Sequence, residues 1–249
     1  VTFVYGKKYL NGKGESTAPE LLKKTFFGIK IEWLIYIISL LSVFVFWQMV
    51  QSHEVVSSSL MVAGVLSAVY ILYYSITQVD KKAREQLFAL TILIVFTIIF
   101  WALFEQAYTS LNLFADRVLD RGDIPAGSFL SLNALFIILL APVFAWLWVK
   151  LGKYNPNTAV KFSLALMLVG LGFGSLVLGI NISEMGKVGM IWLVITYFLH
   201  TCGELCLSPV GLSAVTKLSP PKIVGFMMGV WFLATASSEF IASILANIA

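Results

Sequence analysis

Long uninterrupted runs of apolar residues dominate the chain, and short polar stretches separate them. Each run is about 20 residues long, the length that a helix needs to cross the roughly 30 Å hydrocarbon core of a bilayer. The runs lack the alternation of apolar and polar positions that membrane barrel strands show, so the pattern predicts helices. Seven membrane-spanning helices are expected, near residues 31–50, 59–77, 87–108, 129–149, 160–180, 189–210 and 223–246.

The composition agrees with an integral membrane protein. Hydrophobic residues make up 59% of the 249 residues and charged residues 12%, whereas a soluble domain carries about 25% charge. The net charge of +4 therefore does not indicate a nucleic-acid partner, and none is expected. Cys202 and Cys206 lie in one apolar run and are expected to be small buried residues rather than a disulfide or a metal site. No cofactor is expected, and the absence of an HExxH motif or a comparable nucleophile arrangement argues against an enzyme.

Lysine and arginine are concentrated in every second loop, which predicts the orientation of the spans. Cytoplasmic loops carry an excess of these residues. The side that is rich in them includes the segment before the first span, and the opposite side holds the remaining three, Arg117, Arg121 and Lys187. The N-terminal side is therefore expected to be cytoplasmic and the C-terminus to lie outside. The odd number of spans and the apolar ending "ILANIA" predict a fragment, with at least one further span to follow and a larger N-terminal part missing.

Glu204 lies near the middle of its expected span, with no lysine or arginine within a turn or two. Ionisable groups at membrane depth are costly and usually face a cavity or a partner. Its charge must therefore be met by another helix, a ligand or a proton, and pairing with a purely structural cation is the alternative. His200, four residues earlier, shares the same helix face. It could tune Glu204 or be a hydrogen-bonded histidine with a structural role.

Glu105 ends an apolar run in which residues 87–104 contain no charge. The helix is expected to continue through "AYTSLNLFADR", which would place Glu105 in the outer half of the membrane. Two interpretations stay open. The carboxylate could contact lipid headgroups, or it could bind a proton and switch its interactions when it does so.

Other signals within the spans are weaker. Asn133 lies near the start of the fourth span, and Trp231 shares a helix face with Thr235 and Ser238. Trp231 lies several residues from the nearer end of its span, which favours a pocket over the membrane interface. Two glycine pairs four residues apart predict close helix packing; these pairs are Gly170/Gly174 and Gly225/Gly229.

Two long blocks, "FWALFEQAYTSLNLFADR" and "GELCLSPVGLSAVTKLSPPKIVGFMMGVWFL", resemble the proton-dependent oligopeptide transporters, the peptide branch of the major facilitator superfamily. The resemblance covers essentially the whole chain. It implies an all-α membrane protein, the C-terminal six-helix half of a major facilitator fold from a bacterium, with helices seven to eleven present and helix twelve missing. Residues 1–30 would be the end of helix six and a cytoplasmic loop, 31–80 two inserted transmembrane helices, and 81–249 the C-terminal transporter half.

The resemblance also implies roles for five residues. Glu105 matches the acid of helix seven that takes part in proton coupling, and Glu204 matches the acid that holds the amino terminus of the peptide. Ser208, one turn later, would line the same pocket, Asn133 would contact the peptide backbone, and Trp231 would border a pocket for a side chain. The ExxER motif, lysine and tyrosines of the family belong to the N-terminal half and do not occur here.

The function that this resemblance implies is proton-coupled symport of di- and tripeptides by alternating access, across the bacterial cytoplasmic (inner) membrane. The partners would be the peptide, protons, the lipid bilayer and the missing N-terminal half. One alternative is a proton-coupled transporter of another small solute on the same scaffold. Another class is a seven-helix receptor, which the predicted orientation disfavours; the last span also has no lysine for a retinal Schiff base.

Overall fold

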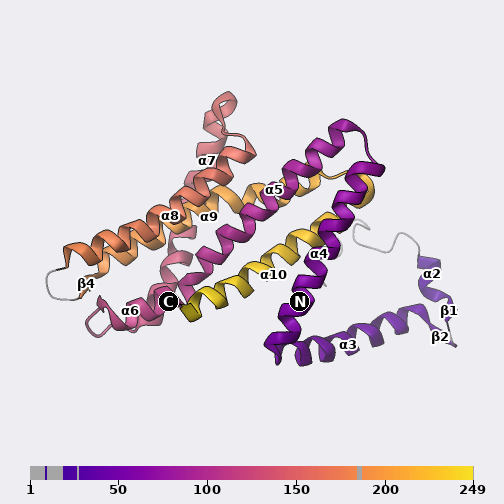
Figure 1. Ribbon diagram of the computed structural model, residues 1–249, viewed down its shortest axis with the longest axis horizontal. Coiled ribbons are helices and arrows are strands. Elements are labelled where there is room, and N and C mark those ends of the chain that lie inside the picture. Colours follow the sequence, from indigo (N-terminus) through magenta and orange to yellow (C-terminus); the bar gives the residue numbers. More distant parts are fainter. Residues whose placement is uncertain (1–8, 10–18, 27, 184–186, 249) are drawn as a thin grey trace. The chain divides into compact units, whose positions relative to one another are not determined.

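A computed structural model describes residues 9, 19–26, 28–183 and 187–248 (Figure 1). The chain forms two compact units, residues 1–58 and 59–249. Each unit is described by itself. Most of the predicted segment 1–30 lies outside the described residues, and the predicted boundaries at 30/31 and 80/81 stay predictions.

The first unit contains one long apolar helix. A short helix and a two-residue hairpin precede it, and their bounds are α2 (Pro19–Lys23), β1 (Thr25–Phe26), β2 (Ile29–Lys30) and α3 (Ile31–Val50). Gly28 takes φ +77° in the hairpin turn, a value that glycine adopts without steric cost. Large apolar side chains such as Trp33 and Leu40 are exposed along α3. A helix that is apolar on all sides is suited to lipid.

The second unit, which begins within α4, holds the helices that follow α3. In chain order they are α4 (His53–Thr77), α5 (Lys81–Phe104), η2 (Glu105–Tyr108), α6 (Ser110–Arg117), η3 (Ala126–Leu130), α7 (Ser131–Leu151), η4 (Gly152–Tyr154), α8 (Thr158–Ile182), α9 (Met190–Leu218), η5 (Pro221–Ile223) and α10 (Val224–Ile248). Within the described ranges, seven helical segments are long and apolar enough to cross a membrane. This confirms the predicted number of spans.

Local chemistry explains where two of the long helices begin. Asp80 Oδ1 accepts a hydrogen bond from Ala83 N at 3.2 Å before α5, and Asn157 Oδ1 accepts one from Val160 N at 2.9 Å before α8. Both are N-caps, which satisfy backbone donors that the first turn leaves unpaired. Two short strands, β3 (Leu119–Asp120) and β4 (Val188–Gly189), pair in parallel and join the segment after α6 to the start of α9.

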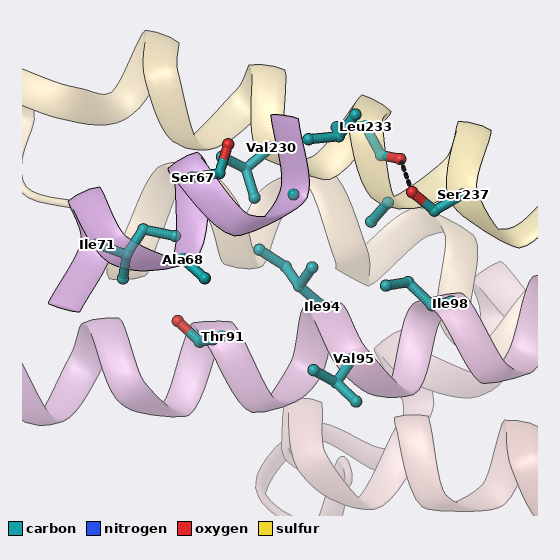
Figure 2. A pocket seen from close by; sticks show the side chains of 12 residues that line it. Ser67, Ala68, Ile71, Thr91, Ile94, Val95, Ile98, Val230, Leu233 and Ser237 are labelled. Carbon is teal, nitrogen blue, oxygen red and sulfur yellow. Dashed lines mark hydrogen bonds between the residues drawn. The ribbon is translucent and has the colours of Figure 1, made fainter. Parts of the chain in front are cut away.

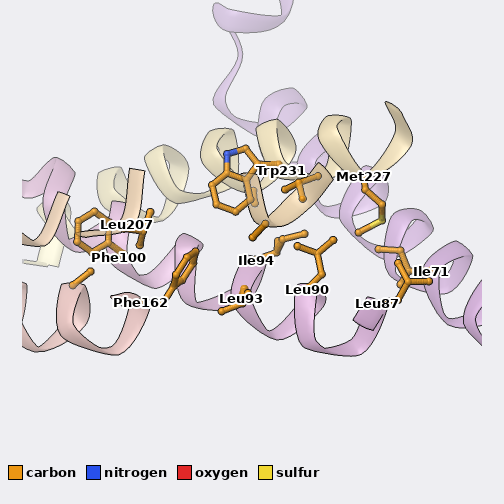
Figure 3. Packing of buried hydrophobic residues seen from close by; sticks show 14 of the residues in the cluster. Ile71, Leu87, Leu90, Leu93, Ile94, Phe100, Phe162, Leu207, Met227 and Trp231 are labelled. Atoms are coloured by element: carbon orange, nitrogen blue, oxygen red, sulfur yellow. The ribbon is translucent and has the colours of Figure 1, made fainter. Parts of the chain in front are cut away.

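Helix α5 packs against three other long helices of the second unit. It contacts α8, α9 and α10, and the most extensive contact between two helices of the unit joins α8 to α9 (Figure 1). Leu87, Leu90 and Phe100 of α5 are fully buried. Figure 3 shows these side chains meeting Phe162 of α8 and Met227 of α10 in one cluster. Because lipid tails are as apolar as leucine, close packing rather than escape from water holds such helices together.

The glycines at which helices approach closely are not the predicted ones. A Cβ atom added to any of the four glycines of the predicted pairs would meet nothing within 4 Å, so the prediction of close packing there is wrong for the described chain. Gly172 instead faces the His200 ring, and Gly179 faces Trp192. The physical reason is the helix face. The side of α8 that is buried carries Gly172 and Gly179, and Gly170 and Gly174 point away from it.

Gly211 of α9 allows the tightest contact with α10. An added Cβ would overlap the six-membered ring of Trp231, whose side chain is 6% exposed. We expect Gly211→Ala to lower the thermal unfolding midpoint of the detergent-purified protein, because overpacking of a filled core costs about 1–3 kcal/mol. Gly174→Ala, made on an open helix face, is the matched control and should leave the midpoint unchanged or slightly raised. Equal midpoints for the two variants would contradict the contact.

Candidate functional site

The α-helix α5 ends one residue before Glu105. α5 stops at Phe104, a 3-10 turn covers Glu105–Tyr108, and Thr109 takes φ −119° and ψ −93° before α6 begins. The apolar span does continue to Arg117. The expectation of an unbroken helix through "AYTSLNLFADR" is therefore wrong at this point.

Gln106 holds this break together and was missed in the sequence. Its side-chain Nε2 donates to the carbonyl of Ala102 at 3.0 Å and to the carbonyl of Ala242 in α10 at 3.1 Å. Its Oε1 accepts from Ser110 Oγ at 2.7 Å and from Thr109 Oγ1 at 3.3 Å. Backbone groups in lipid must find partners inside the protein. Gln106 supplies such partners where the regular α-helical hydrogen bonds stop. A polar amide inside an apolar span, next to Glu105, was the sequence signal that could have identified it.

Glu204 and Asn133 come together, although 71 positions separate them in the chain. Asn133 Nδ2, near the start of α7, donates to Glu204 Oε2 of α9 at 2.9 Å. The same nitrogen contacts Thr201 Oγ1 at 3.2 Å, and that hydroxyl donates to the carbonyl of Tyr197 at 2.7 Å. Asn133 thus fixes one carboxylate oxygen of Glu204. Within the described chain, Glu204 Oε1 and Asn133 Oδ1 have no hydrogen-bond partner and remain available as acceptors.

The charges of the site are all negative in the described part of the chain. No lysine or arginine there forms an ion pair with Glu105, Glu204 or Glu239. Glu239, exposed on α10, was also missed. It is the one acid between residues 224 and 248, so the rule applied to Glu204 would have found it. Three carboxylates without cations create a demand for positive charge or for protons.

His200 is directed toward α8. Its Nε2 lies 3.2 Å from the carbonyl of Val169, and its ring packs against Phe173 with centroids 4.9 Å apart. This contact favours the structural interpretation over tuning of Glu204. The ring also borders a hollow of about 10 Å³ that Asn133 and Tyr197 line, a volume close to the minimum for one water molecule. The described residues around Glu204 and Asn133 therefore form a wall that carries polar groups. The hollow beside this wall is too small to hold a peptide.

Among the described residues, neither Trp231 nor Ser208 is hydrogen-bonded to Glu204 or Asn133. Trp231 packs into the helix core against α9, and its carbonyl accepts from Thr235 Oγ1 at 3.2 Å. Ser208 is half-buried one turn after Glu204. Cys202 and Cys206 are free and buried, as the sequence predicted. The roles assigned to Trp231, Ser208 and Glu105 stay predictions.

Comparison with known proteins gives a consistent result. The sequence pattern of the POT family matches residues 1–249. The peptide transporter YePEPT of Yersinia enterocolitica is 38% identical over 205 residues, which cover 78% of this chain and 40% of that protein. A di-/tripeptide transporter of Lactococcus lactis is 35% identical over 181 residues, covering 69% of this chain and 36% of that protein.

Solved structures show the same likeness. A mutant of the peptide transporter POT in complex with alafosfalin has a TM-score of 0.75 and 34% identity, covering 99% of this chain and 51% of that one. A POT family transporter in complex with 5-aminolevulinic acid has a TM-score of 0.71 and 28% identity, covering 89% of this chain and 48% of that one. The chain thus spans about two fifths of these curated relatives and about half of these solved chains.

Proposed function

This chain belongs to the POT family, and on that basis we propose that it is the C-terminal half of a proton-coupled symporter for di- and tripeptides. The transporter would work by alternating access in the cytoplasmic membrane of a bacterium. In this proposal residues 1–30 are the end of helix six and a cytoplasmic loop, 31–80 are two inserted helices, and 81–249 are helices seven to eleven. The N-terminal end of the chain faces the cytoplasm, as the lysine and arginine distribution favours.

One observation carries the proposal, namely the carboxylate of Glu204 held by Asn133 with acceptor oxygens left open. An ammonium group has three N–H donors and no acceptor. It would find a fixed negative charge in Glu204 and further acceptors in Glu204 Oε1 and Asn133 Oδ1. The absence of a basic partner for Glu204 among the described residues leaves that charge for the ligand.

The other end of a peptide requires the opposite charge. A carboxylate taken out of water needs a cation and hydrogen-bond donors, because an unpaired buried charge costs several kcal/mol. The described wall offers carboxylates and no cation, so the positive charge would come from the N-terminal half of the transporter. A site with one charge on each half would select zwitterionic peptides and would limit their length. Ser208 would complete the polar wall beside Glu204, and Trp231 would border the space for a side chain.

Glu105 suits the role of the proton carrier in this scheme. It lies at the end of the α-helical part of its span, in a 3-10 turn rather than in a regular helix. In the proposed mechanism its carboxylate pairs with a cation of the other half, and protonation breaks that pair. The two halves then rock about the central site, as alternating access requires. The membrane potential contributes about 2.3 kcal/mol per charge per 100 mV to the inward movement of the proton.

Competition in whole cells tests the substrate class. Uptake of a labelled dipeptide by cells that express the full-length transporter should be inhibited by unlabelled di- and tripeptides, and not by free amino acids or tetrapeptides. A collapsed proton gradient should abolish accumulation. Uptake that is indifferent to di- and tripeptides would contradict the proposal.

A second candidate is another small solute that carries an amine. The complex of a POT family transporter with 5-aminolevulinic acid favours it, because that molecule also has an amine and a carboxylate. Competition with this acid in the same assay separates the two candidates. A solute without an amine would leave Glu204 without its proposed role.

A further inference from the structure

A cavity of about 170 Å³ lies between α4, α5 and α10, within residues 59–249 (Figure 2). It is separate from the pair formed by Glu204 and Asn133, and none of the proposed transport residues lines it. Ile94 and Ile98 of α5 and Leu233 of α10 form much of its wall, and α4 covers one side of it.

The cavity exists because α4 packs against its neighbours along part of its length. Toward its C-terminal end Ile71, Tyr74 and Ser75 are buried, and the ring of Tyr70 lies 4.7 Å from that of Phe226 at the start of α10. The C-terminal part of α4 is therefore packed against α10. The residues of α4 one and two turns earlier do not fill the space in front of them.

Those earlier residues are small. Gly64, Ser67 and Ala68 lie on the same face of α4 as Ile71. The spacing of Gly64 and Ala68 is one that commonly lets two membrane helices approach closely. Here a Cβ added to Gly64 would meet nothing within 4 Å, so the helices do not close over this face. The space is left for something other than a side chain of the described residues.

Two of the three hydroxyls at the wall bond to carbonyls of their own helices. Thr91 Oγ1 donates to the carbonyl of Leu87 and Ser237 Oγ donates to the carbonyl of Leu233, each at 2.8 Å. Both hydroxyls are thus satisfied within their own helices. Ser67 contributes the one other side-chain hydroxyl at the wall, and the remaining lining side chains are hydrocarbon. One open hydroxyl does not supply the two to four partners that a buried water needs, so the cavity does not hold water.

The surroundings of the cavity are also apolar. Its three helices belong to membrane-spanning segments, and Val95, which lines it, is half exposed. On α4 the neighbouring Val65, Leu66 and Val69 are exposed. At that depth in a bilayer the medium beside such residues is lipid hydrocarbon. We infer that the cavity binds a segment of a phospholipid acyl chain, held between α4 and the α5–α10 pair. A cavity of about 150 Å³ accommodates benzene, so about six carbons of a chain fit here.

Photo-crosslinking from lipid tests this inference. The full-length transporter is placed in vesicles that contain phosphatidylglycerol with a diazirine midway along one acyl chain. After illumination, mass spectrometry locates the adducts. Adducts should be denser on the cavity residues of α4, α5 and α10 than on exposed positions of α8 such as Val177 and Leu178.

Filling the cavity supplies the decisive comparison. Gly64→Leu projects a side chain into the open space and should reduce the adducts at the cavity to the density seen at the exposed positions of α8. Leu66→Phe enlarges a side chain of the same helix outside the cavity and should leave them unchanged. Circular dichroism and the thermal unfolding midpoint confirm that both variants are folded. Ala68→Leu repeats the test if Gly64→Leu does not fold.

Three results would overturn the inference. Adducts at the cavity could be no denser than on α8 in the unaltered protein. They could persist unchanged in the filled variant. Adducts could also be absent from the cavity because another segment of the full-length transporter occupies it. A crosslinker attached to the Ala68→Cys variant would detect that segment.

Discussion

Glu204→Gln is expected to abolish peptide binding while leaving the protein folded and in the membrane. The glutamine carbonyl can still accept from Asn133 Nδ2, so the 2.9 Å bond between α7 and α9 has a neutral replacement. What disappears is the charge that would meet the amine of the peptide. Loss of one partner from a desolvated charge pair costs about 2–5 kcal/mol, which corresponds to an affinity lower by roughly 30-fold to several thousand-fold. Calorimetry or thermal-shift titration with a dipeptide measures it.

The same substitution at Glu85 is the matched control. That residue lies in the first turns of α5 and is exposed, and Glu85→Gln removes one negative charge without touching the site. Its dipeptide affinity should equal that of the unaltered protein. A Glu204→Gln variant that binds dipeptides normally would sink the assignment, and equal losses in both variants would point to a general effect of charge.

Glu105→Gln is expected to separate transport from its energy source. A glutamine cannot carry the proton, so accumulation of peptide against a gradient should fail. At 100 mV the electrical part of the driving force is about 2.3 kcal/mol per proton, and its loss would lower the accumulation ratio by about 50-fold. Exchange of labelled for unlabelled peptide across proteoliposomes needs no net proton movement and should continue.

Two outcomes decide this second prediction. If both proton-driven uptake and exchange persist in Glu105→Gln, Glu105 has a structural role. If both are lost, the substitution has damaged the site or the movement of the halves. Glu239→Gln, made in the same assay, shows whether the exposed carboxylate on α10 shares the proton with Glu105.

The spans could be predicted from the sequence because a bilayer requires long apolar helices and little else competes with that signal. The ends were less certain. α9 runs to Leu218, eight residues beyond the predicted 210. The apolar pattern weakens at "SAVTKL", but the helix continues through it. Just after the helix end at Phe104, Gln106 bonds to the carbonyl of Ala242 across 136 positions, a contact that no local pattern contains.

The candidate site shows the same division. Glu204 stood out on its own as an unpaired carboxylate at membrane depth, whereas Asn133 was a weak signal that gained a role only from the resemblance. Only the packing of α7 against α9 places the two within a hydrogen bond of each other. The prediction of close packing at the glycine pairs was wrong for the opposite reason. Their spacing was visible, but spacing does not say which side of a helix faces a neighbour, and Gly172 rather than Gly170 lies against His200.

Gln106 also has a mechanical consequence. Its amide joins the turn that carries Glu105 to Ala242, near the far end of α10. Trp231 lies 11 residues earlier on the same helix, about 16 Å away at 1.5 Å per residue. Because the amide of Gln106 is hydrogen-bonded to both segments, a shift of this turn should move α10 with it. A displacement of the turn beside Glu105 would then displace the indole of Trp231 against α9.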